Sequence, residues 1–277
     1  MRFTKMEGLG NDYVYVDGFR ETVADPVAVA KTVSDRRFGI GSDGLILIQP
    51  SDTADFRMEM YNADGSRGEM CGNGIRCVAK YVYDHGIAQQ TTLRGDTDAG
   101  VKTLELTVEN GKVSQVRVDM GVPILERALI PMLGDAGQVI GELMHVQDHA
   151  VRLTAVSMGN PHAVTFVEDV ERALVRVVGP AVEDSPFFPN RVNVEFVQVV
   201  SRTELIQRTW ERGSGETFAC GTGACAVAVA AQLNDLADSD VTIHLRGGDL
   251  RIEWAGEGEP VFMTGPAVEV FQGDITI

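Results

Sequence analysis

The chain has 277 residues, of which 44% are hydrophobic and 23% charged, an ordinary composition for a globular protein that excludes long disordered stretches. Typical domains hold roughly 100–150 residues, so the length favours two domains. The formal net charge of −16 repels nucleic-acid phosphates and anionic lipid headgroups, which excludes binding to nucleic acids and membrane surfaces.

The sequence has neither a membrane span nor a secretory signal. No stretch approaches the roughly 20 apolar residues that a transmembrane helix needs. At the start of the chain, Glu7, Asp12 and Asp17 interrupt any apolar region that could act as a signal. We therefore expect a cytoplasmic protein, in which thiols stay reduced.

Four cysteines are present: Cys71, Cys77, Cys220 and Cys225. In a reducing compartment, catalysis or metal binding explains cysteines better than a disulfide framework does.

Taken in chain order, the first half is expected to form mostly β-strands. Short apolar runs at 13–16 and 45–48 are bounded by Gly, Asp and Pro, and residues 56–61 alternate in polarity as a half-buried strand does. Farther along, two alternating runs at 104–108 and 113–118 flank an Asn-Gly pair, which is a strong hairpin signal.

Two segments are expected to be helical. The first runs from Ile75 to His85 and ends at Gly86, which suits the C′ position of a helix. The second runs from Ala224 to Leu233, and its length and alanine content favour a helix over a buried strand. The sequence Met120-Gly121-Val122-Pro123 breaks the pattern near the midpoint, and we place a domain boundary there.

An internal repeat emerges when the chain is shifted by 149 residues. Cys71-Gly72-Asn73-Gly74 then falls on Cys220-Gly221-Thr222-Gly223, and Gly10-Asn11 falls on Gly159-Asn160. Several matches in one register indicate two copies of one domain facing each other. A site between them would receive one cysteine from each copy.

Each of these two cysteines precedes a Gly-x-Gly turn that opens a helix. Glycine lets the backbone approach a ligand closely, and a helix N-terminus carries about half a positive charge. Such a turn binds a carboxylate and lowers the pKa of a nearby thiol. Both effects serve the removal of the weakly acidic α-proton of an amino acid, because backbone N–H groups stabilise the developing carbanion.

Inversion at a carbon requires a base on one face and an acid on the other. A thiolate and a thiol supply both, with their roles exchanged in the reverse direction. The two in-register cysteines therefore predict an epimerase or racemase that uses Cys71 and Cys220. Cys77 and Cys225 fall inside the expected helices, and we interpret them as core residues.

Metal binding is weakly supported. Five residues separate Cys71 from Cys77 and four separate Cys220 from Cys225, whereas the cysteines of a zinc pair are usually separated by two to four residues. On a helix, the spacings found here also point the two thiols of each pair in different directions. His145 and His149 have a helical spacing, but no glutamate follows His145, so the metalloprotease signature is absent and solvent-exposed histidines are the better interpretation. By spacing alone, His162 either tunes the thiols or is merely a polar strand residue.

A set of motifs surrounds these residues: Gly10-Asn11-Asp12, Tyr61-Asn62-Ala63-Asp64-Gly65-Ser66, Met70-Cys71-Gly72-Asn73-Gly74-Ile75-Arg76-Cys77, Gly159-Asn160-Pro161-His162, Arg191-Val192-Asn193-Val194, Glu211-Arg212-Gly213-Ser214-Gly215-Glu216-Thr217, Ala219-Cys220-Gly221-Thr222-Gly223 and Met263-Thr264-Gly265-Pro266-Ala267. In this combination, the sequence resembles the diaminopimelate epimerase family nearly end to end.

The resemblance implies an α/β (α+β) fold of two pseudo-symmetric domains. Each would be a β-barrel-like sheet around a central helix, with the active site in the cleft between them. We expect residues 1–120 to form the first domain, with the C-terminal strand 267–277 returning to it, and residues 121–266 to form the second. The resemblance also implies conversion of LL-2,6-diaminopimelate to meso-diaminopimelate, in lysine and peptidoglycan precursor biosynthesis, by a cytoplasmic homodimer that needs no pyridoxal phosphate and no metal.

By position, Cys71 and Cys220 match the acid/base pair of the family. Further positions match substrate-binding residues: Asn11, Asn62, Gly72, Asn73, Asn160, Asn193, Glu211, Arg212, Gly221 and Thr222. His162 and Glu211 match residues that modulate the pKa values of the site. Charged carboxylate and ammonium groups suit Arg212 and Glu211 as partners, and asparagines present a donor and an acceptor together.

One position departs from the family pattern. Many members carry Gln where this chain has Gly44, so that side-chain contact cannot exist here. Gly44 also falls on Asn193 in the repeat register, so the two copies have diverged at this point. The sequence therefore does not show which side chain contacts the distal end of the substrate in place of this Gln.

Two alternatives remain. The nearest is another cofactor-independent racemase of similar fold, such as one acting on proline, but Glu211, Arg212 and the asparagines argue against a bare apolar ring as substrate. The other is a thiol redox protein or binding module, which the absence of a Cys-x-x-Cys motif disfavours.

Overall fold

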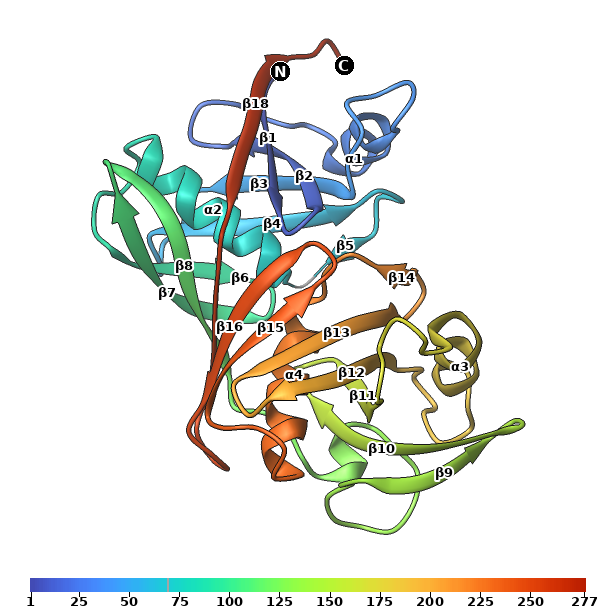
Figure 1. The fold of residues 1–277 in the computed structure, drawn as a ribbon. Coiled ribbons are helices and arrows are strands. Elements are labelled where there is room, and N and C mark those ends of the chain that lie inside the picture. Colours follow the sequence, from blue (N-terminus) through green and yellow to red (C-terminus); the bar gives the residue numbers. More distant parts are fainter. Residues whose placement is uncertain (69) are drawn as a thin grey trace. The chain divides into compact units, whose positions relative to one another are not determined.

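A computed structural model describes residues 1–68 and 70–277 of the chain (Figure 1). The described chain divides into two compact units. The first unit comprises Met1–Asp119 and Thr264–Ile277, and the second comprises Met120–Met263. The predicted boundary after residue 120 lies one residue beyond this division, and the predicted return at residue 267 lies three residues beyond it.

The first unit is built mainly of strands. Its elements are β1 (Arg2–Gly8), β2 (Asn11–Asp17), α1 (Pro26–Ser34), β3 (Gly44–Gln49), β4 (Phe56–Asn62), β5 (Arg67–Gly68), α2 (Gly72–Asp84), β6 (Thr92–Thr97), β7 (Gly100–Glu109), β8 (Lys112–Gly121, which runs past the division) and β18 (Val268–Asp274). Strand β1 pairs antiparallel with β2 and β18, and β2 runs parallel to β3. Strand β4 pairs antiparallel with β3 and β5 and parallel with β6, and β7 pairs antiparallel with β6 and β8.

The second unit repeats this order. It contains a 3-10 turn (Arg127–Leu129), β9 (Glu142–Val146), β10 (His149–Ser157), β11 (Pro161–Phe166), α3 (Val175–Glu183), β12 (Asn193–Ser201), β13 (Glu204–Glu211), β14 (Gly215–Thr217), α4 (Gly221–Leu233), β15 (Asp240–Leu245), β16 (Gly248–Trp254) and β17 (Val261–Gly265). Strand β10 pairs antiparallel with β9 and β11, and β11 runs parallel to β12. Strand β13 pairs antiparallel with β12 and β14 and parallel with β15, which pairs antiparallel with β16.

The repeat extends to the strand register. Tyr13 pairs with Gly44 between β2 and β3, and the residues 149 positions later, His162 and Asn193, pair between β11 and β12. Helices α2 and α4 begin and end at positions with the same offset. One topology is therefore encoded twice along the chain, once in each unit.

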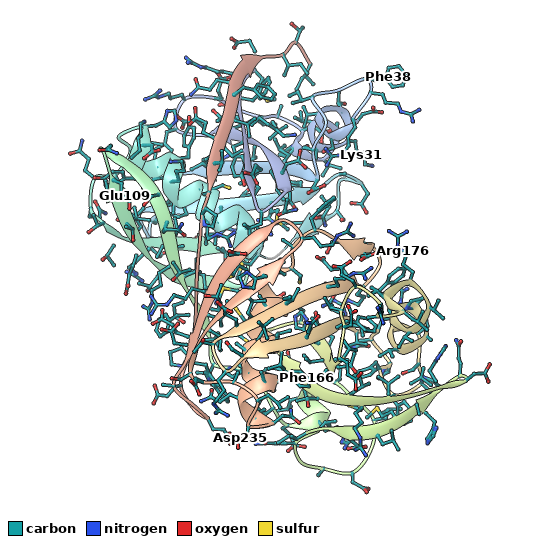
Figure 2. The ribbon with its side chains drawn as sticks, viewed as in Figure 1. Lys31, Phe38, Glu109, Phe166, Arg176 and Asp235 are labelled. Carbon is teal, nitrogen blue, oxygen red and sulfur yellow. The ribbon has the colours of Figure 1, made fainter. Side chains whose placement is uncertain are left out.

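A central helix fills the core of each unit. Ile75, Cys77, Val78 and Val82 of α2 are fully buried, and every residue of the stretch 223–231 of α4 is buried. A helix that is apolar on all sides is stable only inside a protein, which explains why α4 consists largely of alanine and valine. Two of the polar side chains at the periphery are Glu109, at the end of β7, and Asp235, after α4 (Figure 2).

The local signals in the sequence are confirmed. Asn110 and Gly111 both have positive φ angles, 52° and 77°, as a two-residue turn between antiparallel strands requires. Gly86 has a φ of 72° just after α2, which is the left-handed conformation of a C′ residue. His145 and His149 lie on the antiparallel strands β9 and β10 rather than on a helix; His145 is exposed and His149 half-buried.

Close packing at Gly44 explains the departure from the family pattern. A Cβ atom added to Gly44 would come within 2.1 Å of the backbone oxygen of Tyr61 and 2.7 Å of the Tyr13 ring. A side chain at this position therefore requires movement of a paired strand.

We predict that Gly44→Ala and Gly44→Gln both destabilise the protein. Overpacking against a backbone oxygen cannot be relieved by a rotamer change, so thermal unfolding should shift down by roughly 5 °C or more for each variant. Calorimetry measures this shift. An unchanged melting temperature for Gly44→Gln would show that β3 and β4 separate at little cost.

Candidate active site

Both cysteines of the repeat cap the central helices. Cys71 is the N-cap residue of α2, and its Sγ accepts the backbone N–H of Gly74 at 3.4 Å. Cys220 is the N-cap residue of α4, and its Sγ accepts the N–H of Gly223 at 3.3 Å. Each sulfur thus lies at the positive end of a helix, where a thiolate or a bound carboxylate is stabilised.

In the first unit, Cys71 lies beside an asparagine. The Sγ of Cys71 donates to Oδ1 of Asn11 at 3.3 Å, and Nδ2 of Asn11 donates to Oδ2 of Asp43 at 2.7 Å. The side chain of Asn62 donates to Ser66, and the buried side chain of Asn73 accepts from Arg76. The structure therefore brings Asn11 to Cys71, whereas the side chain of Asn73 is engaged within its own helix.

In the second unit, a chain of contacts leads from a buried carboxylate to Cys220. Oε1 of Glu195 lies 2.8 Å from Nδ1 of His162, and Nε2 of His162 lies 3.1 Å from Oδ1 of Asn160. Nδ2 of Asn160 donates to Oγ1 of Thr222 at 3.2 Å, and Oγ1 of Thr222 lies 3.5 Å from Sγ of Cys220. Residues from β11, β12, the bend before β11 and the start of α4 thus form one hydrogen-bonded series.

The remaining predicted residues of the second unit cluster at the end of β13. Oδ1 of Asn193 accepts the backbone N–H of Arg212 at 2.9 Å, and Nδ2 of Asn193 donates to the carbonyl of Pro161. The exposed guanidinium of Arg212 donates to the carbonyl of Asn190, and Oε1 of Glu211 accepts from the hydroxyl of Thr217 at 2.7 Å. Asn193 therefore anchors the backbone at Arg212, and Arg212 keeps further donors free for a ligand carboxylate.

Burial raises the pKa of the Cys220 thiol well above its ordinary value, and the negative charges of Glu211 and Glu195 raise it further. Hydrogen bonds from Thr222 and Gly223 act in the opposite direction. The pKa of Glu211 is itself raised, chiefly by burial, although the Thr217 hydroxyl stabilises its charged form. The lowered pKa that the helix start predicts for this thiol is therefore wrong for Cys220, because burial and the two carboxylates outweigh the helix start.

The side chains that pack against the two helix starts, at Gly74 of α2 and Gly223 of α4, differ in polarity. Beneath Gly223 lie Glu195 and Gln207, with the fully buried Oε2 of Glu195 and Oε1 of Gln207 lacking hydrogen-bond partners. The positions equivalent to Glu195 and Gln207 in the first unit are Ile46 and Met58, and Ile46 lies beneath Gly74. The two cysteines thus have similar backbone geometry and different electrostatic surroundings.

Two residues of these networks, Asp43 and Glu195, were missed by the sequence reasoning. Glu195 interrupts the apolar run of β12, and a single carboxylate on the inward face of a buried strand is a detectable signal of a buried polar contact. Asp43 stands in a polar loop segment, where nothing in the sequence distinguishes it from a surface aspartate.

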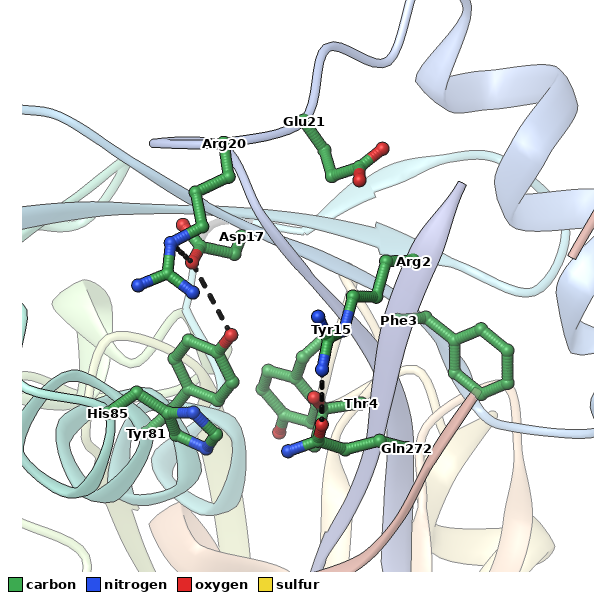
Figure 3. A pocket seen from close by; sticks show the side chains of 10 residues that line it. All are labelled: Arg2, Phe3, Thr4, Tyr15, Asp17, Arg20, Glu21, Tyr81, His85 and Gln272. Atoms are coloured by element: carbon green, nitrogen blue, oxygen red, sulfur yellow. Dashed lines mark hydrogen bonds and ion pairs between the residues drawn. The ribbon is translucent and has the colours of Figure 1, made fainter. Parts of the chain in front are cut away.

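A separate pocket of about 140 Å³ lies in the first unit, near the C-terminal end of α2 (Figure 3). In it, Tyr81 donates to Asp17, Asp17 pairs with Arg20, and Arg2 donates to Gln272. None of the residues predicted for the site lines this pocket. We do not assign it to the site of the cysteines.

Within the described ranges, no group of three or more His, Cys, Asp or Glu side chains is arranged to hold a metal ion. Nor does any helix in that part of the chain have the length and apolarity to cross a membrane. The expectation that the protein needs no metal or cofactor stays a prediction.

Comparison with known proteins decides the family. The family model for diaminopimelate epimerase matches residues 3–126 and 154–270. The chain belongs to the diaminopimelate epimerase family. Diaminopimelate epimerases from Acetivibrio thermocellus and Agathobacter rectalis are 55% and 57% identical to it, over 100% of this chain and 99% and 100% of their own lengths. The enzyme of that name from Methanococcus maripaludis is 52% identical over the full length of both chains.

Solved structures with low identity share the fold. A probable proline racemase from Agrobacterium radiobacter has a TM-score of 0.70 at 15% identity, covering 100% of this chain and 93% of that one. A phenazine biosynthesis protein of the PhzF family from Bacillus anthracis has a TM-score of 0.73 at 15% identity, covering 100% and 99%. The predicted α/β fold is confirmed.

We predict that Glu211→Gln lowers the pKa of Cys220, because it removes the negative charge that contributes most to its elevation after burial. The thiolate absorbance of the Cys71→Ser protein, titrated with and without the second change, measures this. Glu183→Gln serves as the matched control, since Glu183 is a buried carboxylate of the same unit that contacts Trp210 and Gly213 instead. An upward or absent shift in Glu211→Gln would contradict the assignment.

Proposed function

We propose that this protein epimerises LL-2,6-diaminopimelate to meso-diaminopimelate, in lysine and peptidoglycan precursor biosynthesis. In support, its relatives carry the name diaminopimelate epimerase. The protein is thus an isomerase, and we propose that it works without pyridoxal phosphate or metal. The observation that carries the proposal is the pair of N-cap cysteines, Cys71 and Cys220, each at the start of a central helix in one of two repeated units.

In the proposed mechanism, one cysteine as thiolate takes the α-proton from one face of the substrate. The other cysteine as thiol gives its proton to the opposite face, so the configuration inverts and the net charge of the pair is unchanged. In the reverse direction the two exchange roles. Backbone N–H groups at Gly72, Asn73, Gly221 and Thr222 would hold the carboxylate on the reacting carbon and stabilise the carbanion, because these helix starts carry partial positive charge.

The substrate has a second amino-acid end that must be recognised but not inverted. We propose that Arg212 pairs with a substrate carboxylate and Glu211 with a substrate ammonium, supported by Asn11, Asn62, Asn160 and Asn193. An ammonium beside Glu211 would neutralise the charge that raises the pKa of Cys220. His162, linked to Cys220 through Asn160 and Thr222, would tune the same thiol.

The proposal extends to organisation in the cell. We propose a cytoplasmic homodimer with two domains, 1–120 together with 267–277, and 121–266. The net charge of −16 supports a freely diffusing protein that binds a small zwitterionic substrate rather than nucleic acid or a membrane. Light scattering at micromolar concentration tests the dimer.

We predict that Cys71→Ala and Cys220→Ala each lower the rate of epimerisation by at least about 10³-fold, because loss of either group removes proton transfer on one face. The reaction is run in deuterated water; chiral chromatography of LL- and meso-diaminopimelate measures inversion, and mass spectrometry of the separated isomers measures α-deuteration. Cys77→Ala and Cys225→Ala are the matched controls and should keep the activity.

Near-normal inversion in either Cys71→Ala or Cys220→Ala would overturn the two-base mechanism. Turnover of proline at a rate similar to that of LL-diaminopimelate would instead favour the racemase alternative. Activity that is lost on chelation and restored by zinc, or a bound chromophore, would overturn the cofactor-free mechanism.

A further inference from the structure

Two equivalent asparagines orient their side-chain amides differently: one directs its oxygen, and the other its N–H₂ group, toward the side of the nearby cysteine. Asn11 and Asn160 are related by the repeat offset. Asn11 presents Oδ1 to Sγ of Cys71 at 3.3 Å. Asn160 presents Oδ1 to His162 and its Nδ2 to Thr222, the residue that contacts Sγ of Cys220. The backbone repeat alone cannot produce this difference, because it places both asparagines alike.

The orientation of Asn11 follows from a single carboxylate. Nδ2 of Asn11 donates to Oδ2 of Asp43 at 2.7 Å, and the backbone N–H of Asp12 donates to the same oxygen at 3.1 Å. An ionised carboxylate only accepts hydrogen bonds. Asp43 therefore excludes the opposite orientation, in which two oxygens would face each other, and leaves only Oδ1 of Asn11 for Cys71.

Asp43 is itself held on several sides. Its backbone N–H donates to the carbonyl of Asp12 at 2.7 Å, and its own carbonyl accepts from Ala63 at 3.0 Å. Oδ1 of the carboxylate accepts from Arg36 at 2.9 Å. The residue 149 positions later is the fully buried Val192, whose side chain has no hydrogen-bond acceptor, so this arrangement belongs to the first unit alone.

We propose that Asp43 is a positioning residue of the reaction, which turns the Asn11 amide so that its oxygen accepts the Cys71 proton. The inference rests on the proposed function only in taking Cys71 as one of the two acid/base groups. An oxygen acceptor at 3.3 Å stabilises the thiol of Cys71 over its thiolate, whereas an N–H at the same place would stabilise the thiolate. Asp43 thus favours the form of Cys71 that returns a proton to the carbanion.

Few described ionisable groups compete for this role. Tyr15 on β2 and Cys77 on α2 interact with Cys71, and burial raises the pKa of both groups, that of Cys77 to about 12, so neither carries a charge at neutral pH. The charged side chains on the neighbouring elements have partners of their own: Lys5 with Asp12, Glu7 with Gly10, Arg76 with Gly72, Asn73 and Pro266, Arg57 with Asp96 and Asp98, Glu59 with Arg57, Arg117 with Glu105, and Glu269 with His85.

The test titrates Cys71 directly. In the Cys220→Ser protein, the thiolate absorbance of Cys71 is followed against pH, with the Cys71→Ser, Cys220→Ser protein as blank. Asp43→Asn should lower the midpoint by about one pH unit. With its oxygen kept on Arg36, the new amide turns its N–H₂ toward Asn11 and gives up the contact with the backbone N–H of Asp12, so Asn11 reverses and presents N–H to the sulfur.

A double-mutant cycle separates positioning from direct action of the Asp43 charge. In the Asn11→Leu background, Asp43→Asn should leave the Cys71 midpoint unchanged, because no amide remains to be turned. The same downward shift in that background would overturn the proposal, since the charge would then act through space. Asp12→Asn is the matched control: it loses the pairs with Lys5 and Arg36 but leaves the Asn11–Asp43 contact, and its midpoint should stay in place.

Unfolding curves of each variant confirm that the titrated protein is folded. The titration needs no turnover, so its outcome is independent of whether diaminopimelate proves to be the substrate. No shift in Asp43→Asn, with the protein folded, would also overturn the proposal.

Discussion

The contact between a cysteine sulfur and the third N–H of a buried helix is the interaction on which the site depends. A helix start inside a protein leaves N–H groups without partners, and each needs an acceptor. In α2 and α4 the capping acceptor is a thiol, where serine, threonine or aspartate is the usual choice. The same contact thus completes the helix and places a titratable sulfur at its positive end. The first residue after each cap is a glycine, Gly72 or Gly221, which has no side chain to cover the neighbouring N–H groups.

The repeat supplies this device twice, and the surrounding strands then make the two copies unequal. Glu195 and Gln207 lie against Gly223, next to Cys220, whereas the apolar Ile46 lies against Gly74, next to Cys71. A buried carboxylate is tolerated only when it is paired, and His162 is the partner of Glu195. Reversible inversion of configuration is compatible with this inequality, because the two faces of the substrate differ once its distal end is bound.

The same inequality appears in the asparagines. Asp43 directs Asn11 in one unit, and His162 directs Asn160 in the other. The repeat gives the two cysteines similar backbone surroundings, and the difference between them then arises from a few polar side chains one contact away from the sulfur. The packing at Gly44 is part of the same divergence between the units. The side chain of its counterpart Asn193 anchors the backbone of Arg212. At Gly44, the Tyr13 ring and the backbone of Tyr61 occupy the space that a side chain would need.

The sequence by itself determined the elements and the candidate cysteines. Strand alternation, the Asn110-Gly111 turn, the helix ends and the offset of 149 residues are local or periodic signals, and each depends on backbone preferences that a few neighbouring residues decide. Only the tertiary structure showed that Asp43 reaches Asn11, that Glu195 reaches His162, and that His145 and His149 lie on strands rather than on a helical face. The Asn11–Asp43 contact joins residues 32 positions apart, and the His162–Glu195 contact joins residues 33 positions apart. In both cases the side chains meet only after two parallel strands align, and no local preference encodes that alignment.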